Sequence, residues 1–307
     1  MSTPALLVLT PLPEFLVTEL QARYRCVEAN DLTALTEVRA AVGHGGAVVK
    51  AELLDTLPNL EIVAINGVGY DGVDVEACRN RGVKVTHTPD VLTDDVADLA
   101  VALMLMTSRG LVQANRDLHA GQWAAGAGRL TRKVSGKKAG IVGLGRIGKA
   151  IAHRLAAFAM ELAYHGRKPQ PVELRYFPDL VEMAAWCDFL VVITPGGPGT
   201  RHLIDSKVLK ALGRKGVLIN VARGSVVDEA ALMAALEAGE LGGAGLDVFE
   251  HEPEVPAALL KQPELVLLPH VGSATRETRG AMGQLVLDNL AAHFAGEPPK
   301  TLIPDLK

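Results

Sequence analysis

The sequence predicts an α/β protein with two doubly wound parallel sheets, and three observations support this fold class. Short β-branched runs alternate with helical patterns along most of the chain, as they do in successive βαβ units. Most of these runs are apolar throughout, which is typical of strands buried on both faces of a parallel sheet. The runs fall into two series, and 307 residues are enough for two domains, each with its own core.

The expected strands form two series separated by a long stretch without strand patterns. The first series comprises Leu6–Leu9, Ala47–Lys50, Ile62–Ile65 and Val83–Thr86. The second comprises Ala139–Val142, Glu161–Tyr164, Phe189–Ile193, Val217–Asn220, Ala244–Val248 and Leu265–Leu268, and a last helix is expected over Thr278–Phe294. The helical patterns between the strands supply the crossover connections that parallel strands need.

A helix from Thr93 to Arg109 is expected to join the two series. Thr93 can cap its start, and Asp94 and Asp95 suit the positive end of the helix dipole. Arg109 suits the negative end. The segment Gly110–Lys137, called the arm below, follows with five glycines and poor periodicity, so we expect an extended arm or a long loop there.

The composition argues against several classes of function. The net charge is −4 and no run of Lys and Arg exceeds three residues, so a nucleic-acid partner is not expected. The dispersed cysteines, Cys26, Cys78 and Cys187, favour reduced thiols in a cytoplasmic protein and argue against a metal site. The N-terminal segment lacks the basic region of a signal peptide. The longest helix-like apolar stretch, Val96–Thr107, is too short to span a bilayer, so no membrane association is expected.

The strongest local signal is the glycine loop Gly143-Leu-Gly-Arg-Ile-Gly148, which follows an apolar run and precedes a helical pattern over Arg146–Phe158. In this pattern the first glycine permits a tight turn and the second lets the backbone approach a pyrophosphate. The third glycine, Gly148, allows the helix to pack closely on the strand. The phosphates would bind N–H groups at the helix N-terminus. The sequence therefore predicts a dinucleotide site, with a plain glycine-rich turn as the alternative.

The segment after the next strand favours a dinucleotide with a phosphate on its ribose. An NAD site usually has Asp or Glu there, which accepts a hydrogen bond from the ribose 2′-hydroxyl. This chain has Tyr164-His-Gly-Arg-Lys168 instead, and the nearest acids are Glu161, which opens the strand, and Glu173. Arg167 can bind a 2′-phosphate with two parallel hydrogen bonds, and Lys168 adds charge. We therefore expect NADPH/NADP as the cofactor and NADH as a weaker one, with two solvated surface cations as the alternative.

Candidate site residues follow four of the expected strands, at the carboxyl ends where ligands bind in open α/β sheets. In chain order they are Thr194 and Pro195, then Arg223, then Glu250, His251 and Glu252, and finally His270. Arg offers permanently charged donors to a carboxylate and a polarised carbonyl, and His titrates near neutrality and can deliver a proton. A carboxylate beside the His would favour the imidazolium and raise its pKa. These types fit the reduction of a 2-oxo acid by hydride, but spacing leaves open which Glu and which His take part.

Five stretches of the sequence resemble the D-isomer-specific 2-hydroxyacid dehydrogenase family, and the similarity runs over nearly the whole chain. They are Gly67–Asp74, Gly143–Gly148, Asn220–Glu229, Gly243–Pro253 and Leu268–Ser273. The resemblance implies that Arg223, Glu252 and His270 are catalytic, and it selects Glu252 over Glu250. The segment Val91–Ala100 and the basic loop are most similar to the NADPH-dependent glyoxylate/hydroxypyruvate reductases of the family. That likeness implies an enzyme that reduces glyoxylate or hydroxypyruvate with NADPH.

The resemblance also implies two Rossmann-like domains. A flavodoxin-like substrate domain would comprise residues 1–97 and 284–307, and a dinucleotide-binding domain would comprise residues 98–283. Backbone N–H groups of Val68 and Gly69 would bind the substrate together with Arg223 and His270. The cofactor contacts that the family implies fall on Thr93, Gly143, Gly145, Arg146, Ile147, Gly148, Gly166, Arg167, Lys168, Thr194, Pro195, Val221, Ala222, Arg223, Asp247, His270 and Ser273. Several relatives have Ser where Gly166 stands, which removes one possible phosphate contact here.

The family dimerises through its cofactor domain, which implies a homodimer and gives the arm a role in it. In the family a tryptophan like Trp123 can approach the active site of the partner subunit, and a core tryptophan is the alternative. Two other functions compete with a glyoxylate/hydroxypyruvate reductase. One is another D-2-hydroxyacid specificity, and the other is a cofactor-sensing scaffold, against which the intact Arg, Glu and His set argues. Oxidation of formate or phosphite uses NAD and would not favour a basic ribose loop.

Overall fold

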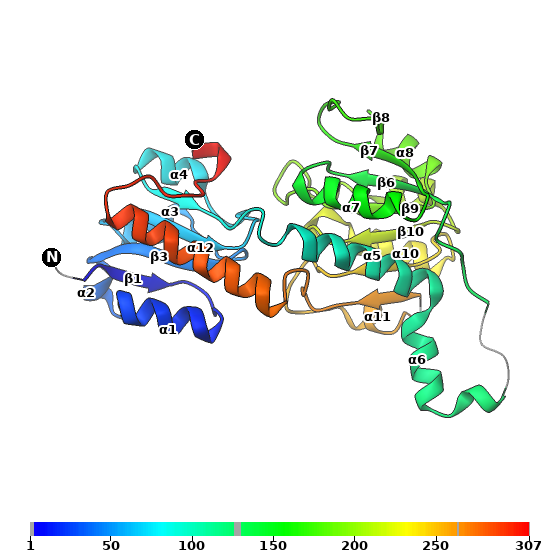
Figure 1. Ribbon diagram of the computed structural model, residues 1–307, viewed down its shortest axis with the longest axis horizontal. Coiled ribbons are helices and arrows are strands. Elements are labelled where there is room, and N and C mark those ends of the chain that lie inside the picture. Colours follow the sequence, from blue (N-terminus) through cyan, green and yellow to red (C-terminus); the bar gives the residue numbers. More distant parts are fainter. Residues whose placement is uncertain (1–2, 126–129, 263, 307) are drawn as a thin grey trace. The chain divides into compact units, whose positions relative to one another are not determined.

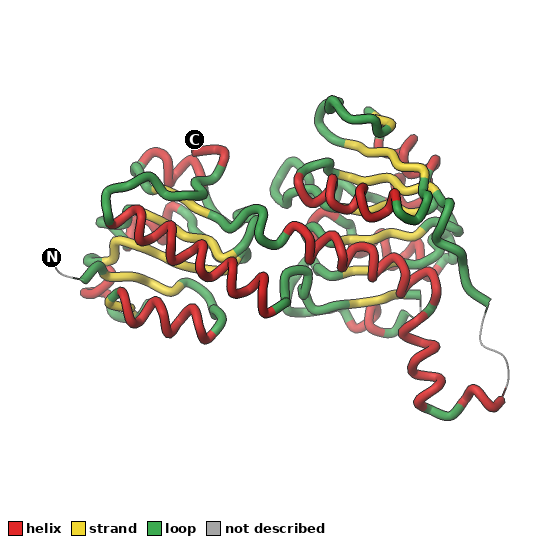
Figure 2. The backbone as a smooth tube through the Cα atoms, viewed as in Figure 1, coloured by secondary structure: helices red, strands yellow, loops and turns green. Residues whose placement is uncertain are grey.

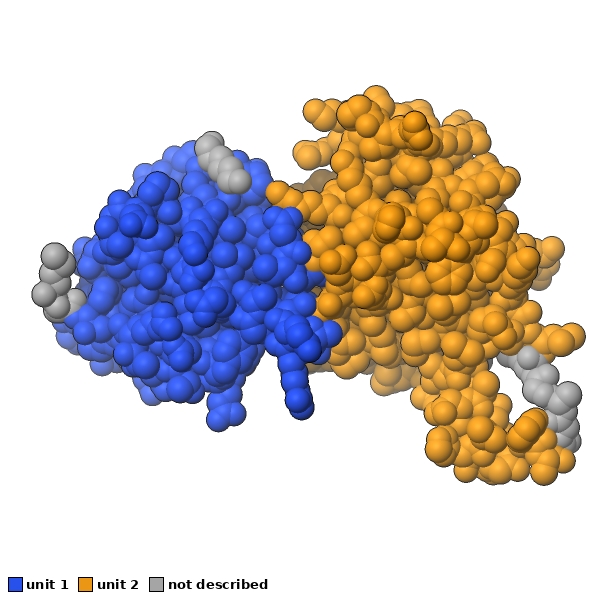
Figure 3. All heavy atoms as spheres, in the orientation of Figure 1, with its two compact units in different colours: residues 1–92, 273–307 blue, residues 93–272 orange. Residues whose placement is uncertain are grey.

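The computed structural model describes residues 3–125, 130–262 and 264–306. The chain divides into two compact units: unit 1 comprises residues 1–92 and 273–307, and unit 2 comprises residues 93–272 (Figure 3). Each unit has one parallel sheet with helices packed on it, as the ribbon and tube views show (Figures 1 and 2). The predicted α/β class with two doubly wound parallel sheets is confirmed.

Unit 1 contains a five-stranded parallel sheet with the order β2-β1-β3-β4-β5, which is the flavodoxin-like order. Its strands are β1 (Ala5–Val8), β2 (Arg25–Val27), β3 (Val38–His44), β4 (Ile62–Asn66) and β5 (Lys84–Thr86). Its helices are α1 (Glu14–Arg23), α2 (Leu32–Leu35), α3 (Ala51–Thr56), α4 (Val75–Asn80), α12 (Arg276–Phe294) and the short η3 (Pro304–Leu306). Because side chains alternate along a strand, Leu6 belongs to the core on one face, which includes Leu290 of α12, and Leu7 belongs to the core on the other, which includes Leu54 of α3.

Unit 2 contains a seven-stranded parallel sheet with the order β12-β11-β10-β9-β6-β7-β8. Its strands are β6 (Lys138–Val142), β7 (Glu161–His165), β8 (Arg175–Phe177), β9 (Phe189–Val192), β10 (Val217–Asn220), β11 (Ala244–Leu246) and β12 (Leu265–Leu267). The chain builds outward from β6 on one side and then crosses to β9 on the other side of β6. The carboxyl ends of β6 and β9 therefore flank the topological switch point, where ligands bind in sheets of this kind.

The helices of unit 2 cover both faces of its sheet, except for α6 and η1 of the arm. They are α5 (Thr93–Arg109), α6 (Leu111–His119), η1 (Gln122–Ala125), α7 (Arg146–Ala156), α8 (Leu180–Trp186), α9 (Ser206–Leu212), η2 (Gly224–Val226), α10 (Glu229–Glu237) and α11 (Ala257–Leu260). Gly245 of β11 lies against Leu103 of α5 on one face. Its neighbour Leu246 packs in a core with Met183 of α8 and Leu209 of α9 on the other.

One sequence prediction of regular structure is wrong. Ala47–Lys50 is not a strand, because Val49 makes only an isolated bridge to Val73, and the strand of this region is β3 (Val38–His44). Of the two alternatives for residues 110–137, the long loop does not hold, because the arm carries α6 and η1, while residues 126–129 lie outside the described residues. The sequence analysis also missed the three-residue strands β2 and β8.

The arm exposes most of its large apolar side chains. Trp123 is 74% exposed, Leu118 58% and Leu111 44%. The alternative of a core tryptophan is therefore wrong for Trp123. No residue of α6 is buried, which is unusual for an amphipathic helix in the fold of a single chain.

The cysteines, the helices and the possible metal ligands can each be compared with what the composition predicts. Cys26, Cys78 and Cys187 are free thiols, and burial raises the pKa of Cys78 to about 11 and that of Cys187 to about 12. Within the described ranges, no helix is both long enough and apolar enough to cross a membrane. In the same residues, no group of three or more His, Cys, Asp or Glu side chains is placed to hold a metal ion.

Candidate active site

The glycine loop between β6 and α7 has two tight positions and one open position. Gly143 has a φ of +99°, and a Cβ added to Gly148 would lie 2.1 Å from the carbonyl oxygen of Gly143. A Cβ added to Gly145 would meet no atom within 4 Å. The first and third glycines therefore allow close packing, and the open side of Gly145 leaves room for a ligand against the backbone.

The start of α7 fits an anion. Its N-cap is Gly145, so no side chain caps the helix there. The N–H groups of a first helical turn have no acceptor within their own helix, and they carry the positive end of the helix dipole. Together with the open side of Gly145, this geometry fits the pyrophosphate of a dinucleotide.

The basic loop after β7 is open to solvent and fits a phosphate. Arg167 and Lys168 are exposed, and among the described residues neither forms an ion pair with a carboxylate. A Cβ added to Gly166 would meet no atom within 4 Å, so space remains beside the backbone. The side chain of Gln170 donates to the carbonyl oxygen of Leu144 over 3.0 Å, which connects the basic loop to the glycine loop.

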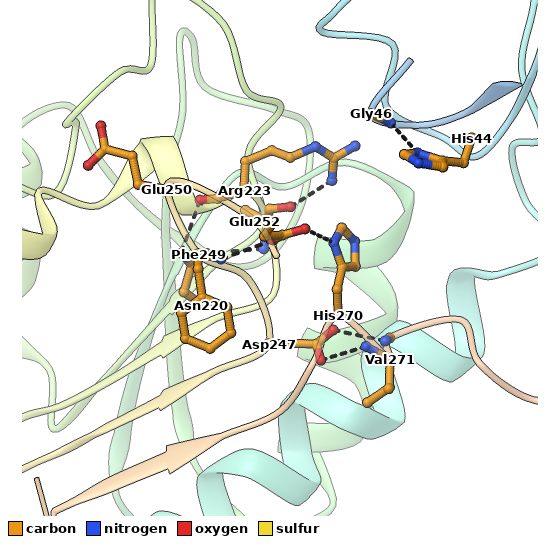
Figure 4. A network of polar contacts seen from close by, with 12 residues as sticks. His44, Gly46, Asn220, Arg223, Asp247, Phe249, Glu250, Glu252, His270 and Val271 are labelled. Atoms are coloured by element: carbon orange, nitrogen blue, oxygen red, sulfur yellow. Dashed lines mark hydrogen bonds and ion pairs between the residues drawn. The ribbon is translucent and has the colours of Figure 1, made fainter. Parts of the chain in front are cut away.

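His270 and Glu252 form a hydrogen-bonded pair. His270 Nδ1 lies 2.7 Å from Glu252 Oε2, and Glu252 Oε1 accepts from the N–H of Phe249 over 3.0 Å (Figure 4). Burial raises the pKa of Glu252, but the hydrogen bond and charge of His270, the Phe249 N–H and the charge of Arg223 outweigh burial, so this pKa lies below its usual value. An ionised carboxylate can only accept, so Nδ1 carries the hydrogen and Nε2 is left to face a ligand.

Asp247 holds the backbone of His270 in place. The N–H of His270 donates to the carbonyl oxygen of Asp247 over 2.9 Å, and the backbone of His270 has a φ of +53°. The Asp247 carboxylate is 2% exposed and accepts from the N–H groups of Val271 and Gly272, each over 2.8 Å. Burial raises the pKa of Asp247, and these N–H donors act against that rise. The structure thus shows what Asp247 does for His270, and its contact with a cofactor stays a prediction.

Arg223 reaches the same part of unit 2 from the loop after β10. The buried side chain of Asn220 accepts from the N–H of Ala222 over 3.1 Å and donates to the carbonyl oxygen of Arg223 over 3.0 Å. A Cβ added to Gly224 would lie 1.8 Å from the carbonyl carbon of Phe249, so the loops after β10 and β11 touch backbone to backbone. This contact places Arg223 close enough for its charge to lower the pKa of Glu252.

Glu250 belongs to a different network. Its Oε1 accepts from Arg201 Nη2 over 2.6 Å and lies 2.9 Å from His202 Nε2, and Figure 4 shows its side chain pointing away from Arg223 and Glu252. Its N–H donates to Oε1 of Glu229 over 2.7 Å, and Glu229 is 8% exposed. Of the two candidate acids, Glu252 is the one that contacts His270.

The remaining predicted cofactor residues of unit 2 lie at strand ends or helix starts. Val221 and Ala222 are 7% and 3% exposed after β10, so their backbone is the part that a ligand would meet. Thr194 and Pro195 follow β9, and the Thr200 hydroxyl donates to the carbonyl oxygen of Pro195 over 2.7 Å. Arg146 and Ile147 open α7, and Thr93 opens α5. Ser273 begins the second segment of unit 1.

Unit 1 contains the loop predicted to bind the substrate carboxylate. Val68 and Gly69 follow the carboxyl end of β4 and are half-buried. In the part of the chain that the structure describes, no hydrogen-bond acceptor is in place for the N–H of either residue. Successive N–H groups without acceptors form a concavity that suits an anion, and a small carboxylate fits this requirement.

The sequence analysis did not recognise the supporting roles of Asn220, Glu229 and Asp247. All three are polar residues within otherwise apolar or helical segments, and each is less than 9% exposed. A buried polar side chain needs hydrogen-bond partners, and here the partners are the loops that carry Arg223, Glu252 and His270. The available signal for Asn220 and Asp247 was their position inside strand patterns, whereas Glu229 opens α10 and no strand pattern marks it.

Comparisons with known proteins identify the family of the chain. A model of the family described as D-isomer specific 2-hydroxyacid dehydrogenase, NAD binding domain, matches residues 101–272, which is more than half of the chain. The glyoxylate/hydroxypyruvate reductase A of Arabidopsis thaliana is 47% identical over 306 residues, 97% of this chain and 98% of that protein. The hydroxyphenylpyruvate reductase of Plectranthus scutellarioides is 48% identical over 307 residues, 97% of this chain and 98% of that protein.

A solved structure gives the same result for the fold. The NADPH-dependent glyoxylate/hydroxypyruvate reductase of Sinorhizobium meliloti, in complex with NADP and malonate, is similar with a TM-score of 0.94. It is 46% identical in sequence, and the similarity covers 99% of this chain and 98% of that chain. The fold, the glycine loop and these relatives together show that the chain belongs to the D-isomer specific 2-hydroxyacid dehydrogenase family.

Proposed function

We propose that the protein reduces a small 2-oxo acid, glyoxylate or hydroxypyruvate, to the 2-hydroxy acid with NADPH. The observation that carries this proposal is the pair of His270 with Glu252 beside Arg223, because it combines a proton donor with a fixed cation. The names of the relatives given above refer to different 2-oxo acids, so family membership alone does not identify the substrate. Reductases for glyoxylate and hydroxypyruvate occur both among the curated relatives and among the solved structures.

The site residues divide the chemistry between them. Arg223 would hold the substrate carboxylate and polarise the carbonyl, and the N–H groups of Val68 and Gly69 would bind the carboxylate as well. His270 would give the proton on Nε2 to the carbonyl oxygen, and Glu252 would stabilise the imidazolium before that transfer. The bound reduced nicotinamide supplies the hydride to the carbonyl carbon. In the reverse direction His270 would act as the base.

The residues present fit NADPH better than NADH. Gly145 and the start of α7 offer an open anion site, and the basic loop offers Arg167 and Lys168 where an NAD site would have an acid. The Sinorhizobium meliloti relative is described as NADPH-dependent and binds NADP. We therefore propose NADPH as the preferred cofactor of this chain and NADH as a weaker one.

We further propose a cytoplasmic homodimer that forms through the cofactor domain, in which the arm takes part, with residues 1–97 and 284–307 as the substrate domain and residues 98–283 as the cofactor domain. The exposed Leu111, Leu118 and Trp123 support the dimer, because a partner would cover this apolar surface. An approach of Trp123 to the active site of the partner subunit is part of the same proposal.

A substrate panel tests the proposed function. The purified chain is assayed with glyoxylate, hydroxypyruvate, pyruvate and hydroxyphenylpyruvate, each with NADPH and with NADH, by the loss of reduced nicotinamide absorbance. The proposal expects the highest kcat/KM for glyoxylate or hydroxypyruvate with NADPH. A chain that binds NADPH but oxidises it with none of these acids would point to the cofactor-sensing scaffold instead.

Arg167→Ala is expected to raise the KM for NADPH about 10- to 100-fold and to leave the kinetics with NADH nearly unchanged. The reason is that losing one charge-assisted contact with the 2′-phosphate costs about 1.5–3 kcal/mol, and NADH has no such phosphate. Initial rates at varied NADPH and varied NADH, with the 2-oxo acid saturating, measure both effects.

Lys215→Ala is the matched control for Arg167→Ala, because Lys215 is an exposed cation of the same unit outside the basic loop. It should change neither cofactor's KM. Equal losses with NADPH and NADH in Arg167→Ala would contradict a role in reading the 2′-phosphate.

Glu252→Gln is expected to slow the reduction at neutral pH and to remove the acid limb that protonation of Glu252 gives to the native rate profile. In the native protein the pKa of Glu252 is lowered by His270, so the carboxylate stays ionised until the pH falls through that lowered pKa. The neutral amide neither titrates nor stabilises a protonated His270, so the rate of the variant should stay low and should not fall further through that pH range. Rate profiles of both reaction directions, measured from acid to alkaline pH, check this.

The controlling comparison is Glu250→Gln, since Glu250 contacts Arg201 and His202 and not His270. Its profile should match that of the native protein. A Glu252→Gln profile that coincides with the native one would remove Glu252 from the proton-transfer site.

A further inference from the structure

The ring of His87 is directed at the loop that is proposed to bind the substrate carboxylate. His87 follows β5 and is 6% exposed. Its Nδ1 lies 3.0 Å from the carbonyl oxygen of Val68. Because a carbonyl oxygen can only accept a hydrogen bond, Nδ1 must carry the hydrogen and donate. The buried ring therefore makes a directed contact with the backbone of this loop.

This contact fixes the direction of a second backbone group. The carbonyl of Val68 and the N–H of Gly69 belong to one peptide plane and point to opposite sides of it in the trans form. His87 holds the carbonyl on its buried side, so the Gly69 N–H points away from His87. The hydrogen bond on the carbonyl also polarises the peptide and makes its N–H a better donor. No acceptor for that N–H is in place among the described residues.

The C-terminal segment of the chain holds His87 itself. The N–H of His87 donates to the carbonyl oxygen of Thr301 over 3.2 Å, and the Thr301 hydroxyl donates to the carbonyl oxygen of His87 over 2.6 Å. The Thr301 hydroxyl in turn accepts from the side chain of Asn289, which is fully buried in α12, over 2.7 Å. Hydrogen bonds at both the N–H and the carbonyl oxygen of His87 fix its backbone, and so fix the point from which its side chain reaches Val68.

Tyr70 completes the surroundings of the ring. Its own ring meets that of His87 edge to face, with centroids 5.6 Å apart and an interplanar angle of 85°. Its hydroxyl donates to Asp305 Oδ2 over 2.6 Å, so it is held at both ends. The contact with the Tyr70 ring and the hydrogen bond to Val68 together restrict the orientation of the His87 ring.

We propose that His87 is a positioning residue for substrate binding, which orients the Val68–Gly69 peptide so that the Gly69 N–H meets the carboxylate of the 2-oxo acid. This inference rests on the proposed function, because it needs the loop to bind that carboxylate. His87 does not touch the substrate itself, so its loss should weaken substrate binding and leave hydride transfer in the bound complex little changed.

Two variants of nearly the same shape separate the hydrogen bond from the packing. His87→Asn keeps an amide donor close to the position of Nδ1, and His87→Leu has a similar branched shape without a donor. His87→Leu is expected to raise the KM for the 2-oxo acid about 3- to 10-fold, with kcat and the KM for NADPH nearly unchanged. His87→Asn should restore most of the substrate KM. His87→Ala is a second variant without a donor, in case the leucine prevents folding.

The control for a merely structural role is Val85→Ala. Val85 lies in β5, is fully buried, and sits two residues before His87. It should lower the melting temperature and leave the substrate KM at the native value. Oxalate, a carboxylate that is not reduced, gives an inhibition constant that should rise in His87→Leu in parallel with the KM.

The outcomes separate this inference from the proposed function. If the native chain reduces the 2-oxo acids and His87→Leu keeps the native KM and the native inhibition constant, the positioning role is wrong and the function stands. If His87→Asn is as weak as His87→Leu, ring packing and not the hydrogen bond is responsible, which also overturns the inference. If the native chain reduces no 2-oxo acid, the proposed function fails and the inference fails with it.

Discussion

Replacing His270 by Ala is expected to lower the turnover of 2-oxo acid reduction about 10²–10⁴-fold while NADPH still binds. The ring donates from Nδ1 to Glu252 over 2.7 Å, so Nε2 is the atom from which a proton can reach the carbonyl oxygen. Alanine removes that donor and leaves the glycine loop and the basic loop unchanged. Steady-state rates measure the loss of turnover, and fluorescence titration with NADPH measures binding separately.

His251→Ala is the matched control for this variant. His251 is exposed, and it lies next to Glu252 in the sequence, so it was the alternative proton donor. We expect native turnover in His251→Ala. Near-native turnover in His270→Ala, together with slow turnover in His251→Ala, would assign the proton to His251 and would contradict the arrangement proposed here.

The sequence predicted most strands of both sheets because apolar runs reveal strands that are buried on two faces. It placed one strand wrongly, since Ala47–Lys50 contains buried valine and alanine and resembles a strand although it only bridges to Val73. The true strand β3 contains two alanines and one glycine and carries Arg39, so its periodicity is weak. Strands of three residues, such as β2 and β8, leave too few positions for any pattern to be detected.

The site was predictable as a set of residue types but not as a set of contacts. Position at the carboxyl ends of parallel strands indicated Arg223, His270 and the Glu250–Glu252 segment, because the topology brings these ends to one edge. Spacing left the choice between Glu250 and Glu252 open, because both lie in a loop, where sequence separation does not determine the direction of a side chain. Long-range contacts decide it: Arg201 and His202 bind one, and His270 binds the other. Such contacts join residues too far apart in sequence for a local pattern to show.

Arg223→Ala is expected to lower kcat/KM for the 2-oxo acid about 10²–10³-fold, through both a lower kcat and a higher KM. The guanidinium would hold the carboxylate in the ground state and stabilise the charge that develops on the carbonyl oxygen in the transition state. Its backbone is fixed by Asn220, and its Nη1 donates to the carbonyl oxygen of Ala222 over 2.7 Å, so the side chain is oriented in advance. Initial rates at varied 2-oxo acid, with NADPH saturating, separate kcat from KM.

Arg223→Lys should recover little of this loss, because an ammonium is a point charge and cannot replace the planar fork of donors that a guanidinium offers to a carboxylate. Arg201→Ala is the control for removal of a positive charge, since Arg201 pairs with Glu250 and makes no contact with the His270–Glu252 pair. If only the charge mattered, Arg223→Lys would be nearly native. If Arg223→Ala were nearly native, another cation would hold the substrate, and Arg276, which opens α12, is the candidate nearest to His270 in sequence.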